Sequence, residues 1–371
     1  MRAKSHLLSS IPSVDGFRMP GEFAAHTKTW MLWPERPDTW RECARPAQKA
    51  FVDVARAIAQ FEPVTMGVNL PQFETARAML PPQVEVVEIA NNDSWMRDCG
   101  PTFVLNGSGK VRGIDWNFNA WGGLEGGLYY PWDLDDAVPR RVLELEGLDR
   151  YQAPIILEGG SIHVDGEGTL ITTEECLRNP NRNPGLSRQN IEVVLKQYLD
   201  ISKVIWLGQG VYNDETSGHV DNLCCFVRPG VVVLTWTDDG SDPQHQISLD
   251  AYRRLEQSRD ARGRNLVIHK LHQPDPVILS RDEASGIQTI AGTKPRLAGE
   301  RMAASYVNFY LCNGGAIVPT FNDSHDQPAL EILRRIMPER KVVGIYAREI
   351  LLGGGNIHCI TQQQPKGKTS S

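Results

Sequence analysis

Cys359 follows a run of three glycines in the segment Gly-Gly-Gly-Asn-Ile-His-Cys, which covers residues 353–359. Consecutive glycines allow the backbone to adopt conformations that other residues avoid and to approach a ligand closely. A thiol placed behind such a loop is therefore a candidate nucleophile. The alternative is that Cys359 is a small buried apolar side chain, as many cysteines are.

His219 lies close in sequence to two acidic residues, so it is a candidate general acid and base. Asp221 follows it by two positions, and on a strand the two side chains would point to the same side. Glu215 precedes His219 by four positions and could orient or charge the imidazole. The alternatives are a polar strand end with satisfied hydrogen bonds, or a metal site, although no His-Glu-x-x-His or similar spacing supports a metal.

Two more carboxylates occur beside aromatic or Gly-rich segments. Asp98 comes shortly after Trp95, and a planar cation can stack on an aromatic ring while a carboxylate accepts its N–H groups two at a time. Glu158 precedes Gly159-Gly160, and Trp121 precedes another glycine pair. The alternatives are a turn-forming Asp98 and a buried, paired Glu158 next to a β-bulge. None of these loops matches a dinucleotide-binding or P-loop pattern, which argues against a nucleotide site.

Taken together, one thiol, one imidazole and several carboxylates describe a site in which sulfur attacks a cation. The composition agrees with a small-molecule enzyme: the net charge is −6, and no dense Lys/Arg block indicates a nucleic-acid partner. The seven cysteines are irregularly spaced without a Cys-x-x-Cys pair, which argues against a disulfide framework or zinc ribbon. No segment has the length of a membrane span or the form of a secretory signal, so we expect no membrane partner and a cytoplasmic location.

The elements that must position these residues recur along the chain. Pairs of short apolar runs joined by Gly-containing turns predict hairpins at 102–115, 161–173, 223–236 and 306–319. Apolar residues at helical spacing follow each hairpin, and one more strand follows each helix. The helices are expected around Phe51, Val142, Ile191, Tyr252 and Leu333, with Ser187 as an N-cap and Ser324 with Gln327 as a capping box.

The pattern predicts an α/β fold of about five strand-strand-helix-strand units. The fifth hairpin would pair Ile357–Thr361 with Thr29–Leu32 and so join the two ends of the chain. Because the candidate residues all stand at the entry to a hairpin, equivalent positions would converge. We therefore expect one catalytic domain over residues 1–371, with flexible tails at 1–15 and 366–371.

Several longer segments resemble those of the agmatine deiminases, which are guanidine-modifying enzymes of the bacterial peptidyl-arginine-deiminase-like group. The resemblance runs from about Gly16 to Pro365. The segments are Trp33–Arg36, Asn117–Gly123, Glu158–His163, Asn213–Thr216 and Gly353–Pro365. The resemblance implies a five-bladed α/β-propeller, the pentein fold, in agreement with the repeats. Cys99 departs from the pattern we expect in relatives and places a second thiol beside Asp98.

The resemblance also implies roles for individual residues. Cys359 would be the nucleophile and His219 the acid and base, assisted by Glu215, while Asp98 and Asp221 would hold the guanidinium. The further residues expected to bind substrate are Trp95, Trp121, Glu158, Gly354 and Gly355.

The implied reaction converts agmatine, a small cation, into N-carbamoylputrescine and ammonia through a cysteine thiouronium, without metal or organic cofactor. It would serve putrescine formation or agmatine breakdown, and a homo-oligomer, dimer or tetramer, is expected. The alternatives are a deiminase acting on arginine or peptidyl-arginine, and a non-catalytic polyamine-binding protein.

Overall fold

The computed structural model describes residues 5–368 as a mixed α/β fold, in which the strands form five sheets. The strands of the described residues, in chain order, are β1 (Leu7–Leu8), β2 (Phe17–Arg18), β3 (His26–Leu32), β4 (Val64–Val68), β5 (Glu85–Glu88), β6 (Thr102–Asn106), β7 (Val111–Asn117), β8 (Arg150–Ile156), β9 (Ile162–Val164), β10 (Thr169–Thr173), β11 (Lys203–Leu207), β12 (Cys224–Arg228), β13 (Val231–Trp236), β14 (Val267–His272), β15 (Tyr310–Cys312), β16 (Gly315–Thr320), β17 (Lys341–Tyr346) and β18 (Gln362–Pro365).

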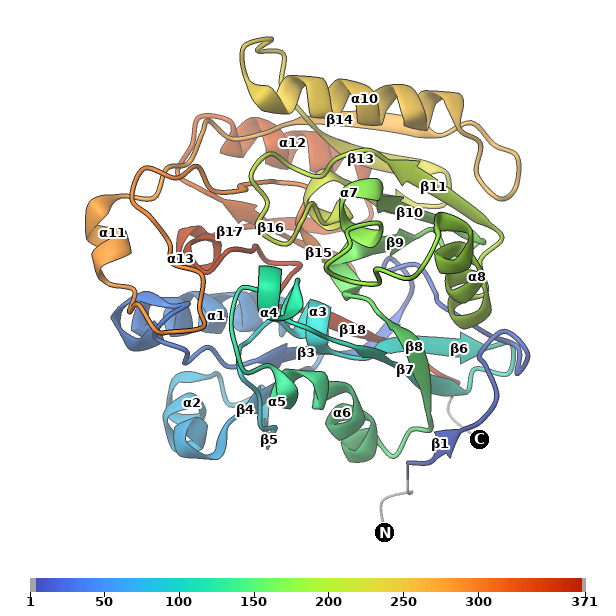
Figure 1. Cartoon of the computed structure of the whole chain (residues 1–371), viewed down its shortest axis with the longest axis horizontal. Helices are drawn as coiled ribbons and strands as arrows, with labels where there is room; N and C mark the ends of the chain where they lie inside the picture. Colours follow the sequence, from blue (N-terminus) through green and yellow to red (C-terminus); the bar gives the residue numbers. More distant parts are fainter. Residues whose placement is uncertain (1–4, 369–371) are drawn as a thin grey trace.

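The helices lie between these strands. They are α1 (Arg45–Ile58), α2 (Phe73–Met79), α3 (Met96–Cys99), α4 (Gly123–Gly126), α5 (Asp133–Asp136), α6 (Val138–Glu146), α7 (Glu174–Leu177), α8 (Arg188–Leu199), α9 (Val220–Leu223), α10 (Pro243–Gln257), α11 (Arg281–Ser285), α12 (Asp326–Ile336) and α13 (Arg348–Leu352), with 3-10 turns η1 (Arg41–Ala44), η2 (Leu70–Gln72) and η3 (Gly159–Ser161). Figure 1 shows α1, α6, α8, α10 and α12 around the outside of the molecule and α3 near its centre. None of the helices in the described residues is both long enough and apolar enough to cross a bilayer.

Every sheet contains the same arrangement of three strands. The sheet orders are β1-β8-β7-β6-β2, β11-β10-β9, β12-β13-β14, β15-β16-β17 and β18-β3-β4-β5. The antiparallel pairs are β6–β7, β9–β10, β12–β13, β15–β16 and β18–β3. The second strand of each pair then runs parallel to a third strand, reached through α6, α8, α10, α12 or α1. The predicted strand-strand-helix-strand unit is therefore confirmed in all five sheets.

The sequence explains the helices that complete these units. In α1, Phe51, Val54, Ala55 and Ile58 recur at helical spacing and are fully buried. Helix α8 begins after Ser187, whose hydroxyl accepts the Asn190 N–H at 3.2 Å as expected for an N-cap.

The capping box predicted for α12 is wrong. This helix begins at Asp326, and the preceding residue makes no side-chain cap. The Asp326 carboxylate instead accepts the Phe321 and Asp323 N–H groups, while the Asp323 carboxylate accepts the His325 N–H. These aspartates bond the incoming loop and leave Ser324 no capping role.

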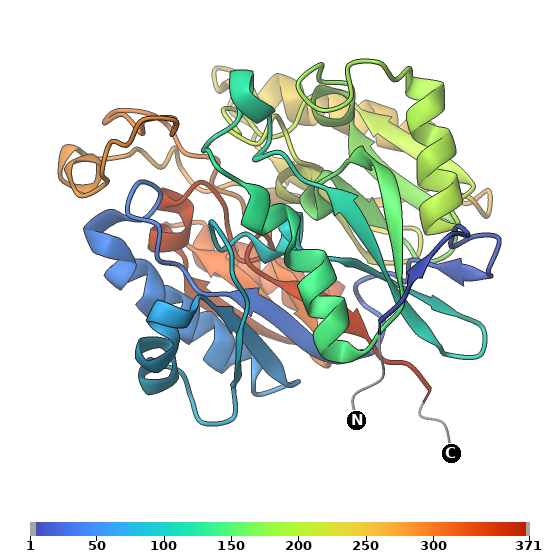
Figure 2. The same cartoon turned by 60° about the horizontal axis from the view of Figure 1, so that its bottom comes forward.

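The two ends of the chain meet in one sheet. Strand β18 pairs with β3, with Gln362 opposite Trp30 and Gln364 opposite Lys28. Figure 2 shows these segments, red and blue, side by side. The partner strand is as predicted, but the C-terminal strand begins at Gln362, so its expected range 357–361 is wrong. Residues 357–360 form a turn instead, and that turn carries Cys359.

The expected terminal tails are described only in part, because residues 1–4 and 369–371 lie outside the described residues. Within the expected N-terminal tail, Leu7 and Leu8 form β1 and pair with Arg150 and Tyr151 of β8. That part of the chain is an edge strand.

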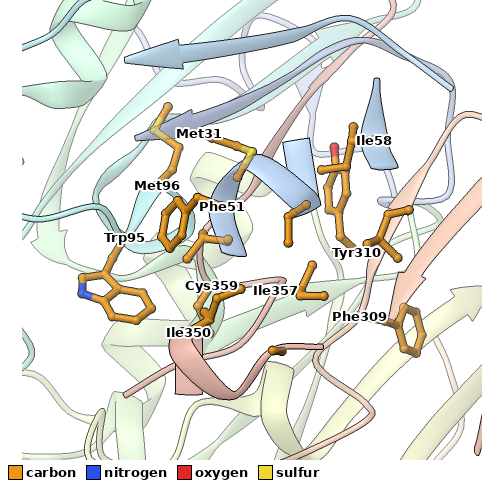
Figure 3. Close-up of a cluster of buried hydrophobic side chains, with 14 of the residues drawn as sticks. Met31, Phe51, Ile58, Trp95, Met96, Phe309, Tyr310, Ile350, Ile357 and Cys359 are labelled. Carbon is orange, nitrogen blue, oxygen red and sulfur yellow. The ribbon is translucent and has the colours of Figure 1, made fainter. Parts of the chain in front are cut away.

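A large cluster of buried apolar side chains supports the turn that carries Cys359. Met31, Phe51, Ile58 and Ile357 all belong to this cluster and are fully buried, and Cys359 lies within it (Figure 3). Burying one such side chain contributes about 1.5–3 kcal/mol. The thiol is thus held by well-packed elements.

Candidate active site

An open cavity with an empty volume of about 450 Å³ lies against the glycine run before Cys359. It is lined by Trp95, Asp98, Trp121, Glu215 and Cys359, together with the glycines 353–355. His219, Asp221 and Glu158 are fully buried next to it. Concave sites with aromatic walls and a few polar groups are typical of small-molecule binding.

The predicted site residues share one structural setting, a single turn just before the first strand of a hairpin. Asp98 lies on α3 before β6, Glu158 precedes η3 before β9, and Cys359 lies in the turn before β18. His219 directly precedes α9, the turn before β12, and Asp221 lies within α9, so the expectation that His219 and Asp221 lie on a strand is wrong. The local turn brings both side chains to the same centre.

Gly160 marks that centre. A Cβ atom at Gly160 would lie 2.7 Å from His219 Nδ1, 2.8 Å from Asp98 Oδ1 and 2.9 Å from Asp221 Oδ2. Atoms of three predicted residues therefore surround one point that only a residue without a side chain leaves open. The expected convergence of these three residues is confirmed.

The Cys359 thiol faces this group. Its Sγ lies 3.9 Å from Asp221 Oδ2 and 3.5 Å from Asn308 Oδ1, and the side chain is buried. Burial, followed by the Asp221 and Asp98 carboxylates, raises the pKa of the thiol well above its usual value. The thiol is thus neutral while the cavity holds no cation.

Asp98 presents a carboxylate to the cavity. Its Oδ2 accepts the Trp121 indole N–H at 3.0 Å, and its Oδ1 accepts the Gly160 N–H at 2.9 Å. Burial raises the pKa of Asp98 to about 6; nearby His219 opposes this shift, and Asp221 adds to it. The carboxylate is ionised at neutral pH.

Asp221 is held by one oxygen only. Its Oδ2 lies 2.8 Å from His358 Nδ1, while Oδ1 is buried without a hydrogen-bond partner. Burial would raise the pKa of Asp221, but the hydrogen bond and charge of His358 lower it overall. An unpartnered carboxylate oxygen at this position can receive an N–H group of a ligand.

His219 is enclosed by carboxylates. Its Nδ1 lies 3.7 Å from Asp98 Oδ2, and its Nε2 lies 3.5 Å from Glu158 Oε2. Burial lowers the pKa of His219, but the Asp98 and Glu158 carboxylates raise it, and the net pKa is well above the usual value. The imidazole is therefore positively charged and can act as an acid.

Glu158 is kept ionised by Arg182, whose Nε lies 2.7 Å from Glu158 Oε1 in a fully buried pair. Burial raises the pKa of Glu158, but the Arg182 guanidinium and His219 bring it down to about 2. Glu158 therefore contacts His219 as a negatively charged carboxylate.

Glu215, expected to assist His219, has a different ion-pair partner. Its Oε1 accepts an N–H of Arg296 at 2.5 Å, and Arg296 also bonds the Gly353 carbonyl. A Cβ atom at Gly354 would lie 1.7 Å from Glu215 Oε1, and the φ of Gly354 is +105°, so only glycine fits there. Glu215 thus connects the glycine run to Arg296 at the cavity wall.

Two tryptophans form aromatic walls. Trp95 stacks on Trp40 with ring centroids 5.1 Å apart and donates its indole N–H to Asp93 Oδ2 at 3.0 Å. Trp121 meets Trp95 edge to face at 6.3 Å. Both rings are fixed by their own hydrogen bonds, so they present rigid surfaces to a flat cation.

Cys99 does not share the cavity with Cys359. Its side chain is buried, and within the described residues Cys359 is the one cysteine that lines the cavity. Burial, followed by the Asp135 and Asp98 carboxylates, raises the pKa of Cys99 well above its usual value. Of these two thiols, only that of Cys359 lines the cavity.

Two buried groups combine the side chains that metal ions prefer. They are Glu22 with His163 and His358, and Glu158 with Cys176 and His219. An arginine already contacts the carboxylate in each group, Arg97 at 3.4 Å from Glu22 and Arg182 at 2.7 Å from Glu158. A positive guanidinium so close opposes a second cation.

Sequence reasoning missed Asn308 and His358. Asn308 precedes β15, the position in the fourth unit that corresponds to Asp98, Asp221 and Cys359 in the others, so the repeat itself was the available signal. Its Oδ1 accepts the His358 N–H at 2.9 Å as well as facing the thiol. His358 directly precedes Cys359, but its contact with Asp221 could be seen only after folding.

Residues 18–365 match the family model of the Porphyromonas-type peptidyl-arginine deiminases. Among curated proteins, a putative agmatine deiminase of Latilactobacillus sakei is 59% identical in an alignment covering 97% of this chain and 99% of that protein. The agmatine deiminase of Ectopseudomonas mendocina is 58% identical, with 96% and 98% covered.

The solved structures similar to this chain also include agmatine deiminases. The structure described as agmatine deiminase of Enterococcus faecalis is 49% identical, with a TM-score of 0.96 and coverage of 98% of this chain and 99% of that one. A Campylobacter jejuni agmatine deiminase with bound substrate has 24% identity and a TM-score of 0.81, which extends the similarity of the fold.

Proposed function

The chain belongs to the Porphyromonas-type peptidyl-arginine deiminase family, and from that premise we propose that it hydrolyses agmatine to N-carbamoylputrescine and ammonia. The enzyme class is that of hydrolases acting on C–N bonds of linear amidines. The support for agmatine is that relatives 57–59% identical over nearly the whole chain are named agmatine deiminases.

One observation carries the chemistry: a buried thiol faces carboxylates that meet around Gly160, beside two fixed indole rings. Asp98 and Asp221 would accept N–H groups of a guanidinium, which fixes the plane of the cation against the sulfur of Cys359. Trp95 and Trp121 would flank the substrate.

The charges around the cavity explain when the thiol becomes reactive. Four buried carboxylates pair with four buried cationic groups beside the thiol. They are Glu22, Asp98, Glu158 and Asp221, with Arg97, Arg182, His219 and His358. A bound guanidinium adds a positive charge next to Cys359, which favours loss of the thiol proton. Substrate binding would thus lower the thiol pKa.

The first half of the reaction forms a covalent bond. The Cys359 thiolate attacks the central guanidinium carbon and gives a neutral tetrahedral adduct. His219 transfers its proton to one amino group, the C–N bond breaks, and ammonia leaves. The product is an S-alkylthiouronium on Cys359, and His219 is left neutral.

The second half hydrolyses that intermediate. Neutral His219 takes a proton from water, and the resulting hydroxide adds to the thiouronium carbon. The C–S bond then breaks while the hydroxyl proton is lost to solvent, which forms the carbonyl of N-carbamoylputrescine and releases the thiolate. Covalent catalysis divides one difficult displacement into two easier steps. Glu158, 3.5 Å from His219 Nε2, would stabilise the charged imidazole in both.

Free arginine is a second candidate substrate, because Lys294 and Arg296 also line the cavity. A site for arginine needs a cationic partner for the α-carboxylate, and these side chains are of the required type. Asp38, Asp93 and Glu215 line the same cavity and suit the distal ammonium of agmatine.

The proposal extends to the domain organisation, the oligomeric state, the location and the pathway of the protein. The five sheets would be the blades of one α/β-propeller, which forms a single catalytic domain over residues 1–371. The protein would act in the cytoplasm as a homo-oligomer, without nucleic-acid or membrane partners, in putrescine formation or agmatine breakdown.

Ammonia release measured with agmatine, arginine and a blocked arginine peptide tests the proposal. We expect the highest kcat/KM with agmatine and no measurable turnover by Cys359→Ser. A preference for arginine would identify the second candidate. No ammonia from any of the three substrates would support a non-catalytic binding protein and overturn the proposal.

A further inference from the structure

A buried histidine outside the cavity connects the substrate-facing carboxylate to the N-terminal part of the chain. Resting on the proposed function, we propose that His358 is a positioning residue: clamped by Glu22, it holds Asp221 ionised and oriented so that the second oxygen of Asp221 receives the guanidinium of the substrate.

The contacts form a continuous chain of three side chains. His358 Nε2 lies 2.6 Å from Glu22 Oε2, and His358 Nδ1 lies 2.8 Å from Asp221 Oδ2. All three residues are at most 5% exposed. Water therefore does not compete for these bonds, and each is stronger than its counterpart on a surface.

This arrangement requires a charged imidazole. A neutral imidazole has one donor nitrogen and one acceptor nitrogen, whereas both nitrogens donate in the charged form. Here a carboxylate oxygen faces each nitrogen within 2.8 Å. With both carboxylates ionised, only the charged ring satisfies both contacts. His358 thus gives Asp221 an opposite charge and a fixed hydrogen bond.

Glu22, at the far end of this chain of three side chains, is held by further contacts. Glu22 Oε1 accepts the Leu311 N–H of β15 at 2.8 Å, and Arg97 Nη2 lies 3.4 Å from Glu22 Oε2. The His358 backbone N–H bonds Asn308 Oδ1 at 2.9 Å. The ring can therefore neither rotate nor shift without breaking several buried bonds.

Two further groups pack on His358. Arg97 donates its Nε–H to the His358 carbonyl at 3.3 Å, and its charge opposes that of the imidazole, whereas the two carboxylates favour it. The other group is His163, whose ring centroid is 6.0 Å away. His163 Nδ1 accepts the Phe226 N–H at 3.3 Å, so that nitrogen carries no proton. His163 is therefore neutral and adds no charge to the chain of three. Asp221 Oδ1, buried and unpartnered, is the atom that this clamp leaves available for the substrate.

The test compares two alkylating reagents at Cys359, chloroacetamidine, which carries an amidinium, and neutral iodoacetamide. Each rate constant is measured on the Cys359 peptide by mass spectrometry and divided by the rate constant with free cysteine. The ratio of the two normalised rate constants measures how well the carboxylates hold a planar cation. This measurement requires no turnover of agmatine. Wild type, Glu22→Gln, His358→Gln, Asp221→Asn and the double variant Glu22→Gln/Asp221→Asn are compared.

Glu62→Gln is the matched control. Glu62 is also a buried carboxylate paired with a histidine, with Oε1 at 3.0 Å from His26 Nδ1. Its other hydrogen bonds involve Thr29, Tyr310 and Asn313, none of which lines the cavity. The same amide substitution at Glu62 therefore changes a buried pair without touching Asp221.

We expect the reagent ratio to fall about 10-fold in Glu22→Gln, the value of one charge-assisted contact, and at least as far in His358→Gln. Glu62→Gln should keep the wild-type ratio. Because Glu22 acts through Asp221, the double variant should fall no further than Asp221→Asn alone.

An unchanged reagent ratio in folded Glu22→Gln, or an additive loss in the double variant, would overturn the proposal. If His358→Gln does not fold, the reagent ratio of Glu22→Gln decides whether the proposal stands. With agmatine, Glu22→Gln should raise KM more than it lowers kcat. A wild-type protein that releases no ammonia from agmatine, yet shows these ratios, would refute the proposed function and leave the role of His358 standing.

Discussion

Substituting Gly160 by alanine is the most direct test of whether the three side chains around it form the working site. The added methyl carbon would lie 2.7 Å from His219 Nδ1, 2.8 Å from Asp98 Oδ1 and 2.9 Å from Asp221 Oδ2. Ordinary contacts between such atoms are about 3.4–4 Å, so each group would have to move by more than about half an ångström. The φ of Gly160 is not in the left-handed region, so alanine adds no backbone strain.

The substitution should affect folding stability and catalysis by different amounts. Overpacking of this kind costs about 1–3 kcal/mol of folding free energy. Displacing catalytic groups by up to about 1 Å reduces the rate about 100-fold. We therefore expect kcat/KM for agmatine to fall about 100-fold in Gly160→Ala, while the protein remains folded.

The assay pairs ammonia release with urea unfolding, and Gly240→Ala is the control because a Cβ at Gly240 meets no atom within 4 Å. The control should match wild type in both measurements. A folded Gly160→Ala protein whose kcat/KM stays within about threefold of wild type would refute the site as described.

Further predictions concern charge, buried pairing and cofactors. Because the pKa of Asp98 is raised to about 6, the carboxylate is ionised above that pH and neutral below it, so kcat/KM should decline on the acid side near pH 6. Bound substrate favours the ionised form, so the acid limb of kcat should lie at lower pH; a flat kcat/KM profile down to pH 5 would contradict this assignment. Arg182→Met leaves the carboxylate of Glu158 buried without its guanidinium partner. Urea unfolding should show that this substitution lowers the free energy of unfolding by about 3–5 kcal/mol. The control Arg56→Met removes an exposed ion pair and should change the free energy of unfolding by less than about 1 kcal/mol. Prolonged dialysis against a chelator should leave ammonia release unchanged, and its abolition would indicate a metallohydrolase.

The repeating unit could be predicted because each hairpin, helix and strand carries its own local pattern. The helix expected around Phe51 is α1, and Ser187 caps its helix as expected. What the pattern could not supply was the single turn before each hairpin. Four-residue turns such as α3 and α9 have no periodicity to detect, so His219 and Asp221 were expected on a strand.

The candidate site was predictable in its members but not in their partners. The repeat brought Asp98, Asp221 and His219 to one centre, since equivalent positions converge. Which carboxylate contacts His219 depends on long-range packing. Arg296 comes from residues 286–302, a segment without regular structure apart from an isolated bridge, and binds Glu215, so Glu158 is the nearer carboxylate.

The central claim is that the sulfur of Cys359 bonds to the guanidinium carbon, and peptide-level mass spectrometry of protein quenched during turnover of agmatine tests it most directly. The account predicts a Cys359 peptide heavier by the mass of agmatine less ammonia, present during turnover and gone once substrate is exhausted. An adduct on Cys99 or another residue, or turnover with unmodified Cys359 at every quench time, would contradict it.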